Sequence, residues 1–204
     1  RFSVELIGTV VAAREWRLAT GGYLGHMFEL YSYWTWIPAF AAASLTQHST
    51  MSPMVVSLVA FAGIASGALG SIWGGLAADR RGREWLVTIA MIASGTCAAV
   101  IPFTFGKGLI ALLVVVLAWG FFVVADSAQF SALVTESVPP HGVGTALTLQ
   151  TSLGFLLTMV SIQLIPPVVA RVGWQWAFPI LALGPVFGVA SIRRLVRFRR
   201  SQRS

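Results

Sequence analysis

Long apolar runs separated by short polar segments make up most of the chain. A run needs about 20 residues to cross a hydrocarbon core of about 30 Å, because an α-helix rises about 1.5 Å per residue. Every run is predicted to be helical, since a span in lipid must satisfy its own backbone and the period-2 alternation of a membrane barrel is absent. Six runs reach this length, with ends placed to within about three residues: 18–44, 53–78, 85–105, 109–133, 143–168 and 174–195.

Composition agrees with this pattern. A mean hydropathy of +0.79 and only 10% charged residues would give a soluble domain far more apolar surface than one core can bury. We therefore predict an all-α integral membrane protein with the lipid bilayer as its first partner. Residues 1–16 are interpreted as a cytoplasmic linker segment, 17–195 as a six-helix transmembrane domain, and 196–204 as a basic cytoplasmic tail.

The basic residues are distributed unequally between the two sides of the predicted bundle. With the N-terminus in the cytoplasm, only Lys107 and Arg171 of the 14 basic residues fall in outside loops. The positive-inside rule then predicts both termini in the cytoplasm. We expect the protein to be integral to the plasma (cytoplasmic) membrane. Nucleic acid is not expected as a partner despite the net charge of +7, because no folded soluble domain remains to present a basic face.

The arginine-rich stretch from Arg193 to Arg200 has two interpretations. It either anchors the end of the last span as a stop-transfer signal, or it binds anionic lipid head groups. Each basic residue near the surface contributes about 1 kcal/mol to such binding.

The loop between the second and third predicted helices carries the clearest motif of the sequence, formed by Gly75, Asp79, Arg80, Gly82 and Arg83. Gly82 permits a tight reversal between two helices. Asp79 can pair with Arg83 across the turn or cap the start of a neighbouring helix. Such a pair would hold the cytoplasmic helix ends together in one conformation and release them in another.

This loop resembles the signature of the major facilitator superfamily, in which glycine, aspartate, a base, glycine and a further base recur at this spacing. Ala77 stands where the family often has leucine, and Glu84 where it often has another base. The resemblance implies two inverted three-helix repeats that form half of a twelve-helix bundle. The first helix looks like the seventh of such a transporter, so we expect the C-terminal half, with the N-terminal six-helix half as its missing partner.

A second match to the superfamily follows the fourth predicted helix, at Glu136-Ser137-Val138-Pro139-Pro140-His141-Gly142. His141 replaces the usual arginine, so a salt bridge to it from Glu136 would depend on pH. The resemblance assigns Asp79, Arg83 and Glu136 to a cytoplasmic gate. Alternatively, Glu136 simply ends a helix near the lipid head groups.

Asp126 and Gln129 lie three residues apart, in the cytoplasmic half of the fourth predicted helix. They either join the charge network of Asp79 and Arg83 or pack against a neighbouring helix. The sequence leaves both interpretations open.

Ionisable residues within a span are costly, and the first predicted helix carries two, His26 and Glu29, on one face. Tyr33 and Trp36 continue that face. The four residues are expected to line a water-filled path or a binding cavity, because Glu29 turned to lipid would lack a partner. Glu29 is either a proton or cation site with His26 as its hydrogen-bond partner, or the pair is a packing contact between helices.

Small and weakly polar residues form faces on two other helices. Gln150 and Thr158 share a face of the fifth predicted helix and are suited to line the substrate path. Equally, they join helices by interhelical hydrogen bonds, worth about 0.6–2 kcal/mol each. Glycines recur in the second predicted helix at 63, 67, 70 and 74, a spacing that favours close helix packing over contact with a substrate.

Three classes of function remain to be compared. The Gly-x-Ser-x-Gly setting of a serine hydrolase is absent and no histidine pair falls at metal-ligand spacing, so no catalytic residue, metal site or cofactor is predicted. A channel or structural membrane subunit is the alternative, but no selectivity loop is evident. We predict a secondary active transporter of a small solute, coupled to protons, that works by alternating access.

Overall fold

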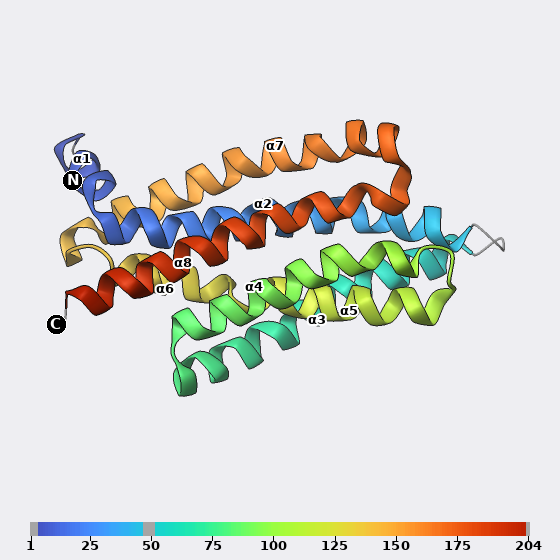
Figure 1. Ribbon diagram of the computed structural model, residues 1–204, viewed down its shortest axis with the longest axis horizontal. Helices are drawn as coiled ribbons and strands as arrows, with labels where there is room; N and C mark the ends of the chain where they lie inside the picture. Colours follow the sequence, from blue (N-terminus) through green and yellow to red (C-terminus); the bar gives the residue numbers. More distant parts are fainter. Residues whose placement is uncertain (1–3, 47–51, 203–204) are drawn as a thin grey trace.

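The computed structural model describes residues 4–46 and 52–202, which form a bundle of helices with no strand among them (Figure 1). This confirms the predicted all-α class. The α-helices are α1 (Val4–Ala12), α2 (Arg14–Leu45), α3 (Pro53–Arg81), α4 (Arg83–Val100), α5 (Leu109–Ala125), α6 (Ser127–Thr135), α7 (Val143–Ala177) and α8 (Leu183–Ser201). Short 3-10 helices follow three of them: η1 (Ile101–Thr104), η2 (Pro140–Gly142) and η3 (Phe178–Ala182).

Local sequence signals set several helix ends. Ser52 begins α3, where its Oγ accepts a hydrogen bond from the Met54 backbone N–H at 3.3 Å, with Pro53 at the first helical position. Gly82 separates α3 from α4 with φ +91°, a conformation that side chains disfavour. The tight reversal expected at Gly82 is thereby confirmed.

Some helices extend beyond the apolar runs that predict them. α2 begins at Arg14 rather than at residue 18, and α8 continues to Ser201 rather than ending at residue 195. A helix can continue past the apolar run because its backbone hydrogen bonds are satisfied in water as well as in lipid. The break between the last two long helices comes at Gly173, which has φ +76° within α7.

Within residues 4–46 and 52–202, four helical segments are long and apolar enough to cross a membrane: Pro53–Arg81, Arg83–Thr104, Leu109–Thr135 and Pro140–Ser201. The last contains α7, which is interrupted at Gly173, together with η3 and α8. α2 is not among the four, and it carries His26 and Glu29 on its buried side.

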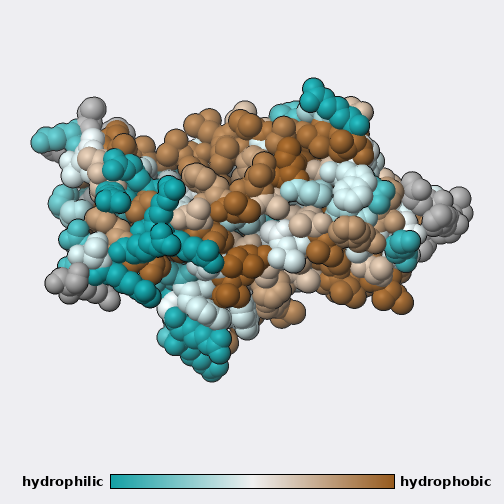
Figure 2. Space-filling view, in the orientation of Figure 1, coloured by the Kyte–Doolittle hydropathy of each residue, from teal (hydrophilic) through white to brown (hydrophobic). Residues whose placement is uncertain are grey.

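Both ends of the described chain lie at the same end of the bundle, together with the turn between α6 and α7 (Figure 1). The largest hydrophilic areas lie at this end and at the α3–α4 turn, with smaller ones at the opposite end, whereas the middle of the surface is mostly apolar (Figure 2). The bundle thus has a polar end, where the described chain begins and ends, and an apolar middle that suits a bilayer.

α3 and α5 pack most closely, through the glycines of α3. A Cβ on Gly70 would meet the backbone oxygen of Phe121, and one on Gly74 that of Ala125. From the other side, a Cβ on Gly120 would meet the backbone oxygen of Gly63. The predicted packing role of the glycine repeat is confirmed, because no other residue allows the two backbones to approach this far.

Replacing one of these glycines is expected to separate α3 from α5. In Gly70→Ala the added methyl group collides with a backbone oxygen, and overpacking of this kind costs about 1–3 kcal/mol. The midpoint of thermal unfolding in detergent should fall accordingly. Gly144→Ala is the control, because nothing lies within 4 Å of its Cβ position; an equal fall in both variants would contradict the packing role.

Candidate functional site

Glu29 of α2 lies at the centre of the bundle and is only 1% exposed. Its Oε1 accepts a hydrogen bond from Trp119 Nε1 of α5 at 2.7 Å, and its Oε2 accepts one from Ser94 Oγ of α4 at 2.8 Å. One carboxyl group therefore joins three helices. Hydrogen bonds to both oxygens offset the cost of burying it.

His26 lies one turn earlier on α2 and faces the break between α5 and α6. Its Nδ1 is 3.0 Å from Asp126 Oδ1, and its Nε2 is 3.2 Å from Ser127 Oγ. His26 and Asp126 are both buried. Asp126 Oδ1 accepts no hydrogen bond within residues 4–46 and 52–202, so its contact with His26 is an ion pair by distance alone.

The expected hydrogen bond between His26 and Glu29 is not formed. Both oxygens of Glu29 are bonded to Ser94 and Trp119, and His26 pairs with Asp126 instead. Residues three apart share a helix face, but these two side chains reach different neighbouring helices. Their partners depend on how α2 is rotated against α4, α5 and α6, which spacing alone does not determine.

Tyr33 and Trp36 continue the same side of α2 and bond to backbone oxygens. Tyr33 Oη donates to the Val116 carbonyl at 2.8 Å, and its ring centroid is 4.6 Å from that of Trp119. Trp36 Nε1 donates to the Ile162 carbonyl at 2.9 Å. In this structure both side chains hold helices together.

On α7, Gln150 and Thr158 are both buried but differ in their hydrogen bonding. Thr158 Oγ1 donates to the Phe155 carbonyl of its own helix at 2.7 Å. Gln150 Oε1 has no hydrogen-bond partner in the described part of the chain. A buried acceptor left unpaired costs about 1–3 kcal/mol, so Gln150 is the better candidate for a contact with water or a solute.

At the polar end of the bundle, Arg83 of α4 connects to α6. Its Nε donates to Glu136 Oε1 at 2.9 Å, and its Nη1 donates to Gln129 Oε1 at 3.1 Å. Glu136 thus pairs with Arg83, as the gate interpretation requires. Gln129 joins this network, whereas Asp126 belongs to the His26 cluster.

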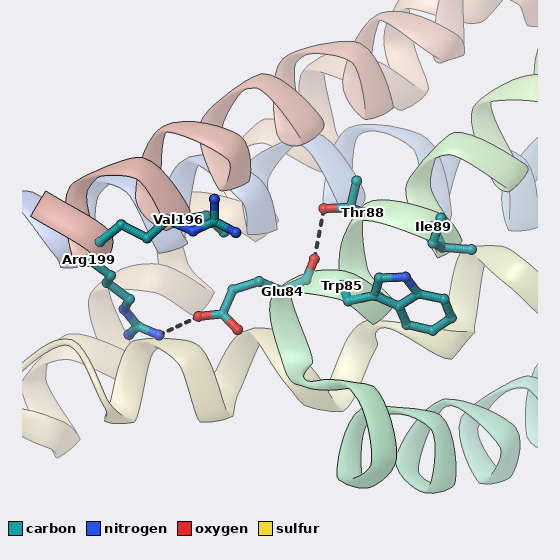
Figure 3. Close-up of a pocket in the computed structure, with 7 residues that line it drawn as sticks. Glu84, Trp85, Thr88, Ile89, Val196 and Arg199 are labelled. Carbon is teal, nitrogen blue, oxygen red and sulfur yellow. Dashed lines mark hydrogen bonds and ion pairs between the residues drawn. The ribbon is translucent and has the colours of Figure 1, made fainter. Parts of the chain in front are cut away.

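Arg199 of α8 is the second cation of this end, and sequence analysis missed its role. Its Nε donates to Glu15 Oε2 at 2.9 Å. Its Nη1 donates to Glu84 Oε1 at 2.7 Å (Figure 3). Nη1 also lies 3.5 Å from Glu136 Oε2. The guanidinium is charged at any physiological pH, so it links α8 to α2, α4 and α6. The run of similar arginines gave no signal that this one is different.

The remaining residues of the loop motif form no ion pair with Arg83 or Arg199 among the described residues. Asp79 and Arg80 are exposed at the end of α3, and Asp79 makes no ion pair or hydrogen bond among the described residues. The expected pair between Asp79 and Arg83 is therefore not formed in this structure, because Arg83 points toward α6. Gly75 is half-buried with open space at its Cβ position.

Comparison with known proteins identifies the family. The sequence model described as Major Facilitator Superfamily matches residues 22–204. The chain belongs to this superfamily. The bundle is also similar to the inward-open xylose transporter XylE from E. coli, with a TM-score of 0.70 and 15% sequence identity. The match covers 88% of this chain and 47% of XylE, so the chain spans about half the length of that transporter. No curated protein matches the sequence.

Membership in the Major Facilitator Superfamily makes this chain an integral membrane protein with a transporter fold. The likeness to XylE shows the fold alone, because the two sequences are only 15% identical. Within that fold, the described residues form two polar clusters. One is buried around Glu29, His26 and Asp126, and the other lies at the polar end around Arg83 and Arg199.

Arg199→Gln should loosen the polar end of the bundle. Glu15 and Glu84 lose their shared cation, and since the side chains are 18–29% exposed, the change in global stability is expected to be small. Hydrogen exchange should instead become faster locally, at the first turns of α2 and α4. Arg197→Gln, which removes an arginine without a described ion pair, is the control; equal exchange in the two variants would argue against the link.

Proposed function

We propose that the chain is the C-terminal six-helix half of a secondary active transporter that moves a small solute by alternating access. Superfamily membership and the 47% coverage of XylE support a half. In this arrangement α2, α3, α4, α5 with α6, α7 and α8 are the six spans. The first three spans and the last three would be the inverted repeats, with the N-terminal half as the partner.

The proposed orientation puts the polar end, with both termini, in the cytoplasm. Two basic residues do not belong to the cytoplasmic group in this orientation. Lys107 lies shortly after η1, and Arg171 lies in the last turns of α7. In the plasma membrane this orientation places most basic residues in the cytoplasm, as the positive-inside rule requires.

We further propose that transport is coupled to protons through the buried cluster. Glu29 and Asp126 are each about 1% exposed, and no lysine or arginine contacts either of them among the described residues. A buried carboxyl without a neighbouring cation can release or take up its proton when water reaches it. Alternating access brings water to it from each side in turn. His26 would share the proton with Asp126, since its Nδ1 lies 3.0 Å from that carboxylate.

Glu29→Gln tests this coupling in the whole transporter reconstituted in vesicles. The amide keeps the acceptor for Trp119 or Ser94 but cannot carry a proton, so uphill uptake driven by a pH gradient should be lost. Exchange of labelled for unlabelled solute, which needs no net proton movement, should persist. A panel of solutes that includes xylose, the substrate named for XylE, would supply the label.

Glu5→Gln, at an exposed acid of α1, is the matched control and should leave both assays unchanged. Uphill uptake that survives in Glu29→Gln would remove this residue from the coupling. Flux that is only downhill and insensitive to a proton uncoupler in the unaltered protein would favour the alternative, a channel or structural subunit.

Asp79→Asn tests the gate. Since Asp79 is exposed and makes no described contact within this chain, we expect its partner on the other half or in another conformation. The variant should insert into the membrane in normal amounts while its transport falls by tenfold or more. Equal losses of insertion and transport would indicate a role in folding.

A further inference from the structure

A groove runs along the outside of the bundle between α4 and α8. Its apolar part is bordered by Ile92, Gly95 and Ala99 of α4, by Ala182 at the end of η3, and by Pro185 and Ala190 of α8. Its volume of about 560 Å³ is in the range of sites that hold ligands of several hundred daltons. The small residues Gly95, Ala99 and Ala190 leave the space between the two helices open.

The groove continues toward the polar end, where its border becomes basic. Arg193 borders the apolar part, and Arg200 borders the adjoining hollow with Trp85 and Thr88 (Figure 3 shows this end). Arg193 and Arg200 are exposed and form no ion pair within residues 4–46 and 52–202. Glu84, the acid in this hollow, already pairs with Arg199. The end of the groove therefore carries uncompensated positive charge.

We propose that the α4–α8 groove binds one anionic phospholipid, with its phosphate between Arg193 and Arg200 and an acyl chain along the apolar part. From Leu183, the first residue of α8, to Arg193 the helix rises about 15 Å at about 1.5 Å per residue, which is about one leaflet of a hydrocarbon core of about 30 Å. Trp85 lines the hollow at the basic end of the groove. Indole rings prefer the level of the lipid head groups. The basic end of the groove thus matches the phosphate of a phospholipid, and the length of its apolar part matches an acyl chain.

The positive charge of the groove also favours an anionic phospholipid over other occupants. A second copy of the chain carries the same α8 arginines and a net charge of +7, so it would add repulsion where the groove needs an anion. A soluble phosphate would fill the basic end and leave the apolar part empty. The inference rests on the chain lying in a bilayer and is independent of the solute and direction of transport.

The experiment uses the purified chain in detergent, titrated with phosphatidylglycerol or phosphatidylcholine and observed by native mass spectrometry. One phosphatidylglycerol should bind in preference to phosphatidylcholine. In the double variant Arg193→Gln/Arg200→Gln its affinity should fall tenfold or more, since each basic residue near a lipid head group contributes substantially. Arg194→Gln/Arg197→Gln is the matched control, because it removes the same charge from the same helix but not from the groove border; its affinity should stay within twofold.

A second pair of variants tests the apolar part. Ala190→Trp fills the groove at an exposed position and should weaken phosphatidylglycerol binding, whereas Ala68→Trp, exposed on α3, should not. Glycerol phosphate should not displace the lipid. The proposal is overturned if both double variants lose affinity equally, if phosphatidylcholine binds as well, if glycerol phosphate competes, or if the arginine pair in the groove controls dimer formation instead of lipid binding.

Discussion

The hydrogen-bonded carboxyl of Glu29 is the constraint on which the arrangement of the helices depends. A carboxyl deep in an apolar bundle is tolerated only when donors reach it, and its donors come from α4 and α5. Because both oxygens are used, α2 cannot rotate or slide without breaking a buried hydrogen bond. The helix with the most buried polar side chains is thereby held in the middle of the bundle, with α7 and α8 on one side and α3 and α5 on the other.

The buried cluster and the polar end are connected through the break between α5 and α6. Asp126 stands at this break and faces His26, while Gln129, one turn further on α6, accepts a hydrogen bond from Arg83. A change of charge at the His26–Asp126 pair would therefore act on a short helix that also holds one partner of Arg83. Since α6 is separate from α5, it can move without bending the longer helix, which is a physical route from proton to gate in the proposed mechanism.

Hydropathy predicted the helical runs because length and apolar content are properties of each run by itself. Gly82 was predictable for the same reason, since a reversal between two helices is a local requirement. The partners of His26 and Arg83 were not, because each depends on how two helices are rotated against each other. Arg199 illustrates the limit: it sits among five other arginines from Arg193 to Arg203, and only the fold brings Glu15 and Glu84 to it.

The polar end and the α7 side of the bundle differ in how completely their polar groups are paired among the described residues, and the difference bears on where a second half would act. Arg83 and Arg199 pair with Glu15, Glu84 and Glu136 of this chain, so the network of these two arginines needs no anion from outside it. Gln150, by contrast, keeps an unpaired buried oxygen among the described residues. An unsatisfied buried acceptor costs about 1–3 kcal/mol, so a donor in the working protein would stabilise it. In the proposed transporter that donor is the solute, water or the other half, which makes the α7 side the natural place for the two halves to share a site.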